Sequence, residues 1–280
     1  MGPAQPINRA DLAMFLTSNV GGVGSHPARS DGERLVASLD VEWTKNYRVR
    51  NGNRVFAYSV VWLSLLDGHD VDPETLPFGF TSVYLELADD CRDLVTCAAA
   101  DLSATLRKAD FMVGHQLCAD LGVLAANAVP PGTDLSPMVR ESWTPVPVAK
   151  ARSAWHARND ADPKSPRVID TRFDTDPILA GRSRRLVDVC TELGLDVTQP
   201  ELGHRSMTAL HREWIDHGDV EARERITVLN LRHSLSAALV ALRLLGIGGP
   251  GHLDVNRLLD RQLRGTFGWI DHPTFRALVR

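Results

Sequence analysis

The sequence of 280 residues predicts an α/β protein in which helices cover the faces of a mixed β-sheet. Two observations lead to this fold class. Three apolar segments rich in strand-forming residues follow one another before the first helix, and helical and strand patterns then alternate along the chain. Because 44 % of the residues are hydrophobic, the chain can also build the full core that such a fold needs.

The first three strands are predicted at 35–43, 54–66 and 81–87. Each contains the β-branched and aromatic residues that favour an extended backbone. Asn51 and Gly52 lie between the first two segments, and an Asn-Gly pair between two β-rich runs is a strong signal for a hairpin turn. We therefore expect the first two strands to form a long hairpin with a basic, projecting tip.

The later elements follow from capping residues, alanine content and apolar periodicity. Short strands are predicted at 110–115 and 167–171, which brings the sheet to five strands. Helices are predicted at 89–109, 117–128, 182–195 and 219–245. Between them, the proline-rich stretch 129–166 with Trp143 and Trp155 is interpreted as a long irregular insertion. Loops of that length are uncommon unless they serve as lids or binding segments.

Three parts are expected along the chain. Residues 1–34 are predicted to form an N-terminal arm, with a short helix that begins at Asn8 and continues through RADLAMFLTSNV before a Gly/Ser-rich stretch. Residues 35–246 form the main domain. Residues 247–280 are expected to be a C-terminal helical extension that packs on the same domain.

Composition argues against several classes of protein. The net charge of −4 and the pI near 6.2 disfavour an extended nonspecific grip on duplex DNA. No uninterrupted apolar run approaches the about 20 residues of a membrane span, and the N-terminus lacks a basic-then-apolar signal sequence. We therefore expect a soluble, cytoplasmic protein without a membrane partner; nothing in the sequence predicts its oligomeric state. The cysteines fit no zinc spacing and are expected to be reduced thiols: Cys91, Cys97, Cys118 and Cys190.

Two carboxylates interrupt the first predicted strand. Asp40 and Glu42 are two positions apart, so their side chains point to the same side of the strand. Like charges held together favour a cation between them. A third carboxylate, Asp120, lies one turn into a predicted helix. Taken separately, the pair could arise by chance and Asp120 could simply favour the helix dipole.

Three motifs together resemble a known family. LDVEWT carries the carboxylate pair, GHQLCAD leads into the helix with Asp120, and VIDT forms a later strand. In order and spacing they resemble the DEDD superfamily of 3'-5' exonucleases, the DnaQ-like branch of the ribonuclease H fold, over residues 35–246. The resemblance implies a ribonuclease H-like mixed five-stranded sheet flanked by helices. It also implies that Asp40, Glu42 and Asp120 bind two divalent metal ions, Mg²⁺ or Mn²⁺, since hard oxygen ligands suit hard cations.

The fourth metal ligand of this family comes from a C-terminal helix, which here has no acidic residue after Glu224. In one register Leu229 takes the place of the family's tyrosine and His233 that of its aspartate. In the other, His233 is the general base and Ala238 replaces the ligand. We favour the first register, with His233 as a catalytic metal ligand, because its Asn-Leu-Arg context matches better and the stripe through His233 should face the sheet. A buried neutral histidine bonded to a backbone carbonyl is the ordinary alternative.

Substrate contacts are expected next to the carboxylates, because related exonucleases hold the terminal nucleotide there. Trp43 could stack a base, although core packing would explain it equally well. The basic residues of the first hairpin could follow a phosphate backbone, or simply form a solvated loop. The residues expected to contact substrate are Trp43, Thr44, Lys45, Arg48, His115 and Gln116.

The resemblance implies a two-metal-ion 3'-5' exonuclease that releases 5'-mononucleotides from single-stranded DNA or RNA 3' ends or from short oligonucleotides. An imidazole in place of the fourth carboxylate should weaken Mg²⁺ relative to Mn²⁺ and slow the reaction. One alternative is therefore a degenerate exonuclease fold that binds nucleic acid or a protein partner without cleaving. Another is a phosphodiesterase for a nucleotide metabolite, over which the 129–166 insertion would close.

Overall fold

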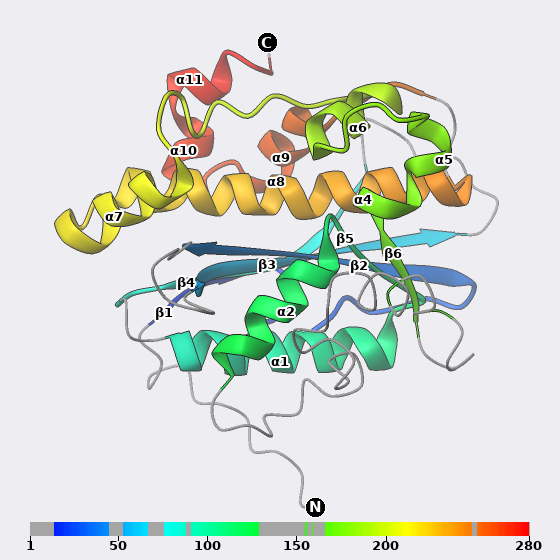
Figure 1. The fold of residues 1–280 in the computed structure, drawn as a ribbon, viewed down its shortest axis with the longest axis horizontal. Helices are drawn as coiled ribbons and strands as arrows, with labels where there is room; N and C mark the ends of the chain where they lie inside the picture. The colour runs from blue at the N-terminus through cyan, green and yellow to red at the C-terminus, as the bar shows by residue number, and fades with distance from the viewer. Residues whose placement is uncertain are drawn as a thin grey trace, which may run out of the picture.

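The computed structural model describes residues 14–44, 53–66, 76–87, 91–128, 155, 159, 166–247 and 251–279. Its centre is a six-stranded mixed sheet in the order β1-β4-β3-β2-β5-β6, with helices on both faces (Figure 1). The predicted α/β class with a mixed, helix-flanked sheet is confirmed. The strands are β1 (Met14–Ser18), β2 (Glu33–Thr44), β3 (Arg54–Leu66), β4 (Gly79–Leu85), β5 (Phe111–Gly114) and β6 (Arg167–Asp170).

Strand β2 lies in the middle of the sheet and joins its two halves. It pairs antiparallel with β3 on one side and parallel with β5 on the other. β3, β4 and β1 continue antiparallel, whereas β5 and β6 are parallel. Residues 35–42 of β2 are buried without interruption, as expected of a strand covered on both faces. Any polar group in this segment is therefore held away from water.

The helices form a layer on each side of this sheet (Figure 1). α1 (Cys91–Lys108) and α2 (Leu117–Asn127) cover one face, and α8 (Val220–Leu245) crosses the other. Further elements lie around α8. They are α4 (Thr171–Asp174), α5 (Asp176–Leu179), α6 (Leu186–Glu192), β7 (Leu195–Asp196), α7 (Met207–His217), β8 (Leu253–Asp254), α9 (Val255–Leu263), α10 (Gly268–Asp271) and α11 (Pro273–Arg276). Of these, α7 lies beside one end of α8 and contacts β1 and β4 of the sheet.

The predicted N-terminal helix and the five-strand count are both wrong. Residues 14–18 form β1, which pairs with the edge of β4 in the register Met14↔Leu85. An open strand edge offers unpaired backbone groups, and pairing with it outweighs the weak helical signal of this segment. Phe15 of β1 also packs edge-on against Trp214, with ring centroids 5.1 Å apart. Asn8, where the helix was expected to begin, lies outside the described residues.

Other predictions differ in their boundaries. The helix expected at 182–195 extends only over Leu186–Glu192. The hairpin turn at Asn51 and Gly52 lies outside the described residues, as does most of the 129–166 insertion. Within that insertion Trp155 is 4 % exposed and belongs to the core cluster against β2 and α1.

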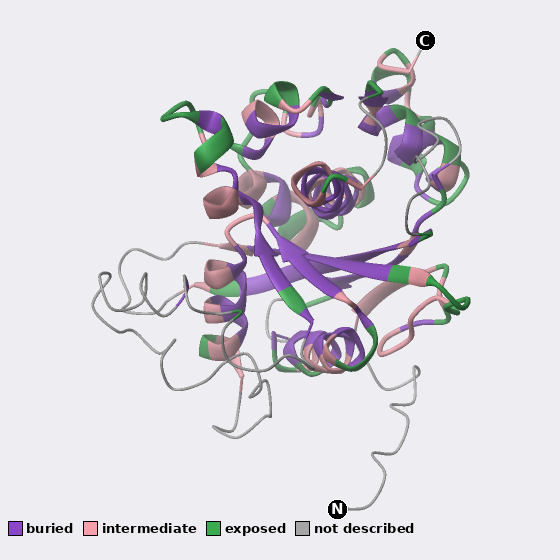
Figure 2. Ribbon diagram, turned by 90° about the vertical axis from the view of Figure 1, so that its right-hand side faces the viewer, coloured by how far each residue is buried: buried purple, intermediate pink, exposed green. Residues whose placement is uncertain are grey.

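Helix α8 is the main buried helix of the fold. By length and mean hydropathy it could cross a membrane, but 78 % of its most apolar window is buried inside the protein. Figure 2, which looks along this helix, shows it enclosed between the sheet and the outer helices. Such burial is typical of the core helix of a soluble protein.

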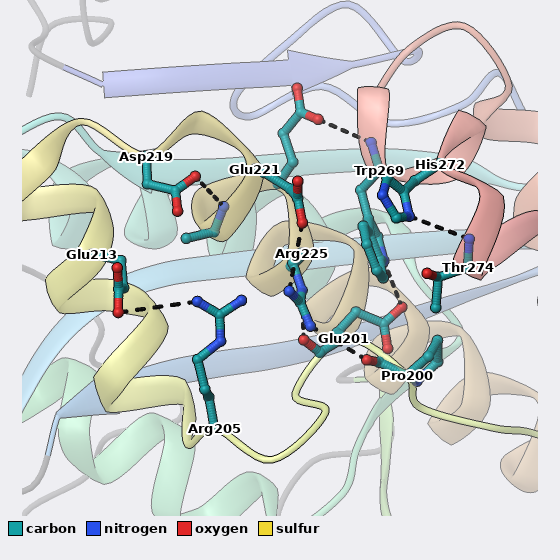
Figure 3. Close-up of polar contacts among 12 residues, drawn as sticks. Pro200, Glu201, Arg205, Glu213, Asp219, Glu221, Arg225, Trp269, His272 and Thr274 are labelled. Atoms are coloured by element: carbon teal, nitrogen blue, oxygen red, sulfur yellow. Dashed lines mark hydrogen bonds and ion pairs between the residues drawn. The ribbon is translucent and has the colours of Figure 1, made fainter.

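A buried ion pair attaches the outer elements to α8. Arg232 donates to Glu201, and both side chains are 0 % exposed. Glu201 also accepts from Trp269 Nε1 of α10 at 3.2 Å, while Arg232 Nε donates to Asn256 Oδ1 of α9 at 2.8 Å. Figure 3 shows Trp269 and Arg225 converging on Glu201. The loop at Glu201 and helix α9 are therefore bonded directly to a single charged group on α8, and α10 is bonded to it through Glu201.

Replacing Glu201 by Gln should destabilise the protein strongly, because the buried Arg232 guanidinium would lose its counter-charge. We expect the free energy of unfolding, measured by urea titration, to fall by about 3–5 kcal/mol. The matched control is Glu221→Gln, since Glu221 pairs with Arg225 at 3.5 Å but is 52 % exposed. That change should cost less than about 1 kcal/mol. Equal, small losses in the two variants would contradict a stabilising role for the buried pair.

Candidate metal centre

Two carboxylates and an imidazole meet where β2 faces α8. Asp40 and Glu42 pair with Ser59 and Ala57 of β3 in the sheet register, and both point toward the helix that carries His233. Each of the three can offer one ligand atom, and these atoms all lie within 4.8 Å of one another. The sequence prediction that Asp40 and Glu42 share a side is confirmed, and His233 lies beside them.

The imidazole bridges the two carboxylates. His233 Nδ1 is 3.4 Å from Asp40 Oδ2 and 3.4 Å from Glu42 Oε1. Asn230, one turn earlier on α8, donates from Nδ2 to Asp40 Oδ2 at 2.6 Å. Next to them, the hydroxyls of Ser59 and Ser234 lie 2.8 Å apart and join α8 to β3. The helix is thus held in the orientation that directs His233 at the carboxylates.

Burial and charge shift the protonation of this cluster. Burial raises the pKa of Glu42, and the neighbouring charge of Asp40 raises it further. Burial by itself would lower the pKa of His233, but Asp40 and Glu42 outweigh it and raise that pKa to about 10. Without a metal ion, the imidazole is therefore protonated at neutral pH and serves as the cation between the carboxylates. A metal ion must displace this proton before Nδ1 can act as a ligand.

Asp120 approaches the same cluster from α2. It lies in the first turn of that helix and is 2 % exposed. Burial raises the pKa of its carboxyl well above the usual value, and the charges of Asp40, Glu42 and Asp170 raise it further. Its Oδ2 is buried and has no hydrogen-bond partner among the described residues. Asp120 is not one of the three residues whose ligand atoms all lie within 4.8 Å, and it stands as a further carboxylate on which the charges of Asp40 and Glu42 act.

The turn that delivers Asp120 is fixed by two local features. Gly114 ends β5 so close to β2 that a Cβ there would lie 3.0 Å from the carbonyl oxygen of Leu39. Gln116 then adopts a left-handed backbone, with φ of 68°, as the N-cap of α2. Its N–H donates to Asp170 Oδ1 at 2.9 Å. Asp170 thereby holds the start of α2 in place, and Gln116 has a structural role in this turn.

His115 lines the cluster in a neutral form. Burial lowers its pKa to about 4, and the positive charge of Arg172 lowers it further. The charge of Asp40 raises the pKa of His115 and the charge of His233 lowers it, so the His115 ring lies near these two residues. Its Nδ1 lies 3.0 Å from Thr171 Oγ1. One ring nitrogen is thus engaged by a threonine, and the ring adds no charge to the site at neutral pH.

The other residues expected to contact substrate have mixed positions. Trp43 and Thr44 end β2 directly after a register shift between Glu42 and Trp43, and both are partly buried. Such bulges commonly redirect side chains beside functional sites. Trp43 packs against the core cluster under β2. Lys45 and Arg48 lie outside the described residues.

The two registers of α8 place different residues near the carboxylates. His233 contacts them, whereas Ala238 is 0 % exposed within the apolar core, and Leu229 is 1 % exposed. Sequence analysis did not identify Asn230 as a site residue. Its spacing of three from His233, which puts both on one helical face, was the signal that could have identified it.

A scan against protein-family models found no match for this chain, and a search of curated proteins found none either. The fold and site therefore define an α/β protein with a buried acidic cluster closed by an imidazole. Any function has to be inferred from that site.

In the metal-free protein, the imidazole of His233 should release its proton near pH 10, which an NMR titration of the ring would show. An unfolded imidazole titrates near about 6.5, so protonation stabilises the fold fully below that pH. This contribution should then diminish as the pH rises toward about 10. The variant His233→Asn should lack this part of the pH dependence of unfolding. Titration of the ring near its ordinary value would contradict the bridging geometry.

Proposed function

We propose that this protein has a ribonuclease H-like fold and acts as a two-metal-ion 3'-5' exonuclease. The observation that carries the proposal is the group Asp40, Glu42 and His233, whose ligand atoms lie within 4.8 Å of one another. The central position of β2, antiparallel to β3 and parallel to β5, supports the fold assignment. The motifs LDVEWT, GHQLCAD and VIDT support the reaction class by resemblance.

The residues present fit divalent cations. Asp40 and Glu42 offer hard oxygen ligands, and the buried Oδ2 of Asp120 has no hydrogen-bond partner among the described residues. One ion would be held by Asp40, Glu42 and His233, and Asp120 would serve the second. Because an imidazole replaces a carboxylate, the site carries less negative charge and a softer ligand, which favours Mn²⁺ over Mg²⁺.

When bound, two such ions supply an activated water and stabilise the leaving 3' oxygen of a phosphodiester. The chain itself positions the groups around that reaction. Asn230 fixes the orientation of Asp40 through its 2.6 Å hydrogen bond. His233 would have to give up its proton to ligate an ion, and the neutral His115 adds no positive charge that would repel one.

The substrate class follows from the same proposal. We propose single-stranded DNA or RNA 3' ends or short oligonucleotides, with Trp43 beside the terminal base and the basic hairpin residues Lys45 and Arg48 along the phosphates. A cytoplasmic location is part of the proposal, because none of the four cysteines forms a disulfide and three of them are buried.

A second candidate is an exonuclease fold that binds nucleic acid or a protein without cleaving. Two observations favour it. The protonated His233 already places one positive charge between the two carboxylates, so part of their charge is balanced without an ion. Leu229 also stands where the family has a water-orienting tyrosine, and it is buried at 1 % exposure.

The main test is incubation of 3'- and 5'-labelled single-stranded DNA and RNA with Mn²⁺ or Mg²⁺. We expect mononucleotide release that is faster with Mn²⁺, and a loss of about 100-fold or more in Asp40→Asn, which removes a metal ligand. The matched control is Asp196→Asn, an exposed aspartate paired only with His252 in the described residues, at 3.2 Å. Release that persists in Asp40→Asn would contradict the proposed site. Binding without release by the wild type would favour the second candidate.

A carboxylate at position 233 should restore the hard-ligand set. We expect His233→Asp to raise Mg²⁺-dependent release relative to the wild type, because the added oxygen ligand suits Mg²⁺. Ala238→Asp should give no such gain, since it buries a carboxylate in the apolar core and destabilises the fold. The rate ratio between Mg²⁺ and Mn²⁺ in each variant is the measurement. A gain from Ala238→Asp alone would support the other register of α8.

A further inference from the structure

Arg172 is a cationic side chain near the candidate metal centre. It belongs to α4, which follows β6 directly, and Figure 1 shows α4 beside α8 at the end of that strand. Asp170 Oδ1 accepts from the backbone N–H of Arg172 at 3.1 Å and from that of Gln116 at 2.9 Å. One carboxylate oxygen thus holds the start of α4 against the turn that leads to Asp120.

The His115 ring connects α4 to the centre. Its Nδ1 lies 3.0 Å from Oγ1 of Thr171, the residue that precedes Arg172. Burial lowers the pKa of His115 most, the charge of Arg172 lowers it next, and the charges of Asp40 and His233 act on the same ring. Such charge effects weaken with distance and are screened beyond about 10 Å. Arg172 is therefore a near neighbour of the centre without being one of its ligands.

The guanidinium of Arg172 has donors to spare. Its side chain is partly exposed. Among the described residues it makes one hydrogen bond, from Nη1 to the carbonyl oxygen of Arg184 at 3.4 Å, and no ion pair. The carboxylates nearest in the sequence bond elsewhere, since Asp174 accepts from the N–H of Asp170 at 2.9 Å and Asp176 from Arg184 at 2.6 Å. Because a guanidinium carries five N–H donors, most of those on Arg172 remain available to a ligand.

Other arginines of this region are already committed to carboxylates. Three of them lie between α5 and α6, and each forms an ion pair: Arg182 with Glu192, Arg184 with Asp176, and Arg185 with Asp188. A new anion would have to compete with those partners. Arg172 differs from them because no described carboxylate has to be displaced.

The charge around the centre gives such a cation a purpose. The centre is acidic, and the chain as a whole has a net charge of −4, so a phosphate strand is repelled wherever no metal ion lies against it. A guanidinium next to the centre attracts the strand, and its planar fork matches two phosphate oxygens. The neutral His115 leaves this attraction unopposed.

We propose that Arg172 binds a phosphate group of the single-stranded nucleic acid next to the candidate metal centre. This inference rests on the proposed function and adds to it a substrate-binding residue that lies far from the Trp43 end of β2 in the sequence. A phosphate contact of this kind forms equally in the bound strand and in the transition state. It therefore contributes to KM and leaves kcat nearly unchanged.

Fluorescence anisotropy with the metal-free full-length protein tests the contact, using a labelled single-stranded oligodeoxynucleotide and the matching oligoribonucleotide. We expect saturable binding that weakens about tenfold in Arg172→Gln, because a charge-assisted hydrogen bond is lost. The slope of log affinity against log salt concentration should also become shallower by about 0.7, as expected for one lost phosphate contact to a single strand. Arg172→Lys, which keeps the charge but not the fork, should lose less affinity and retain the slope.

The matched control is Arg167→Gln. Arg167 is exposed at the opposite end of the same short strand, β6, and the variant should keep the affinity and salt slope of the wild type. Wild-type affinity and slope in Arg172→Gln would overturn the inference. Absence of saturable binding by the wild type, with or without Mn²⁺, would overturn it as well.

Mononucleotide release with Mn²⁺ separates this inference from the proposed function. Release by the wild type, with a KM that rises about tenfold in Arg172→Gln and a kcat within about twofold, would support both. Release with an unchanged KM in that variant would overturn the phosphate contact alone. Binding that weakens in Arg172→Gln, without release by the wild type, would support the contact and contradict the exonuclease.

Discussion

The burial of two carboxylates in the central strand is the constraint on which the rest of the structure depends. Asp40 and Glu42 stand in a segment covered on both faces, where an uncompensated charge would be very unfavourable. The His233 imidazole compensates part of this charge, with its Nδ1 3.4 Å from an oxygen of each carboxylate. This contact forms only when α8 has one position along its axis and one rotation about it. The packing of α8 therefore determines the geometry of the cluster.

Several features of the sequence predicted the site. The period of two in a strand put Asp40 and Glu42 on one side, and the helical stripe put His233 toward the sheet. The strands and longest helices were also predictable, since β-rich runs, alanines and caps all agreed. Strand β1 was not, because it forms only by pairing with the edge of β4, which is a tertiary effect. Asn230 was missed because hydrogen bonding to Asp40 depends on the distance between two elements.

Two kinds of carboxylate serve this fold in different ways. Glu201 is fully buried, and both of its carboxylate oxygens accept hydrogen bonds, one from Arg232 and one from Trp269. Asp120, in contrast, has a buried oxygen without a partner among the described residues. The first kind explains why elements stay where they are. The second kind leaves a buried oxygen to which the described residues donate no hydrogen bond.

Two adjacent residues of α8 make bonds on different sides of the helix. Arg232 bonds Glu201 and Asn256 on the outer side, and His233 bridges Asp40 and Glu42 on the inner side. Successive side chains on a helix diverge by a fixed angle, so turning the helix to relax one set of bonds strains the other. The bonds of Arg232 to α9 and to the Glu201 loop therefore also fix the orientation of the His233 imidazole. Among the described residues, no hydrogen bond or ion pair joins α9 or α10 to Asp40 or Glu42.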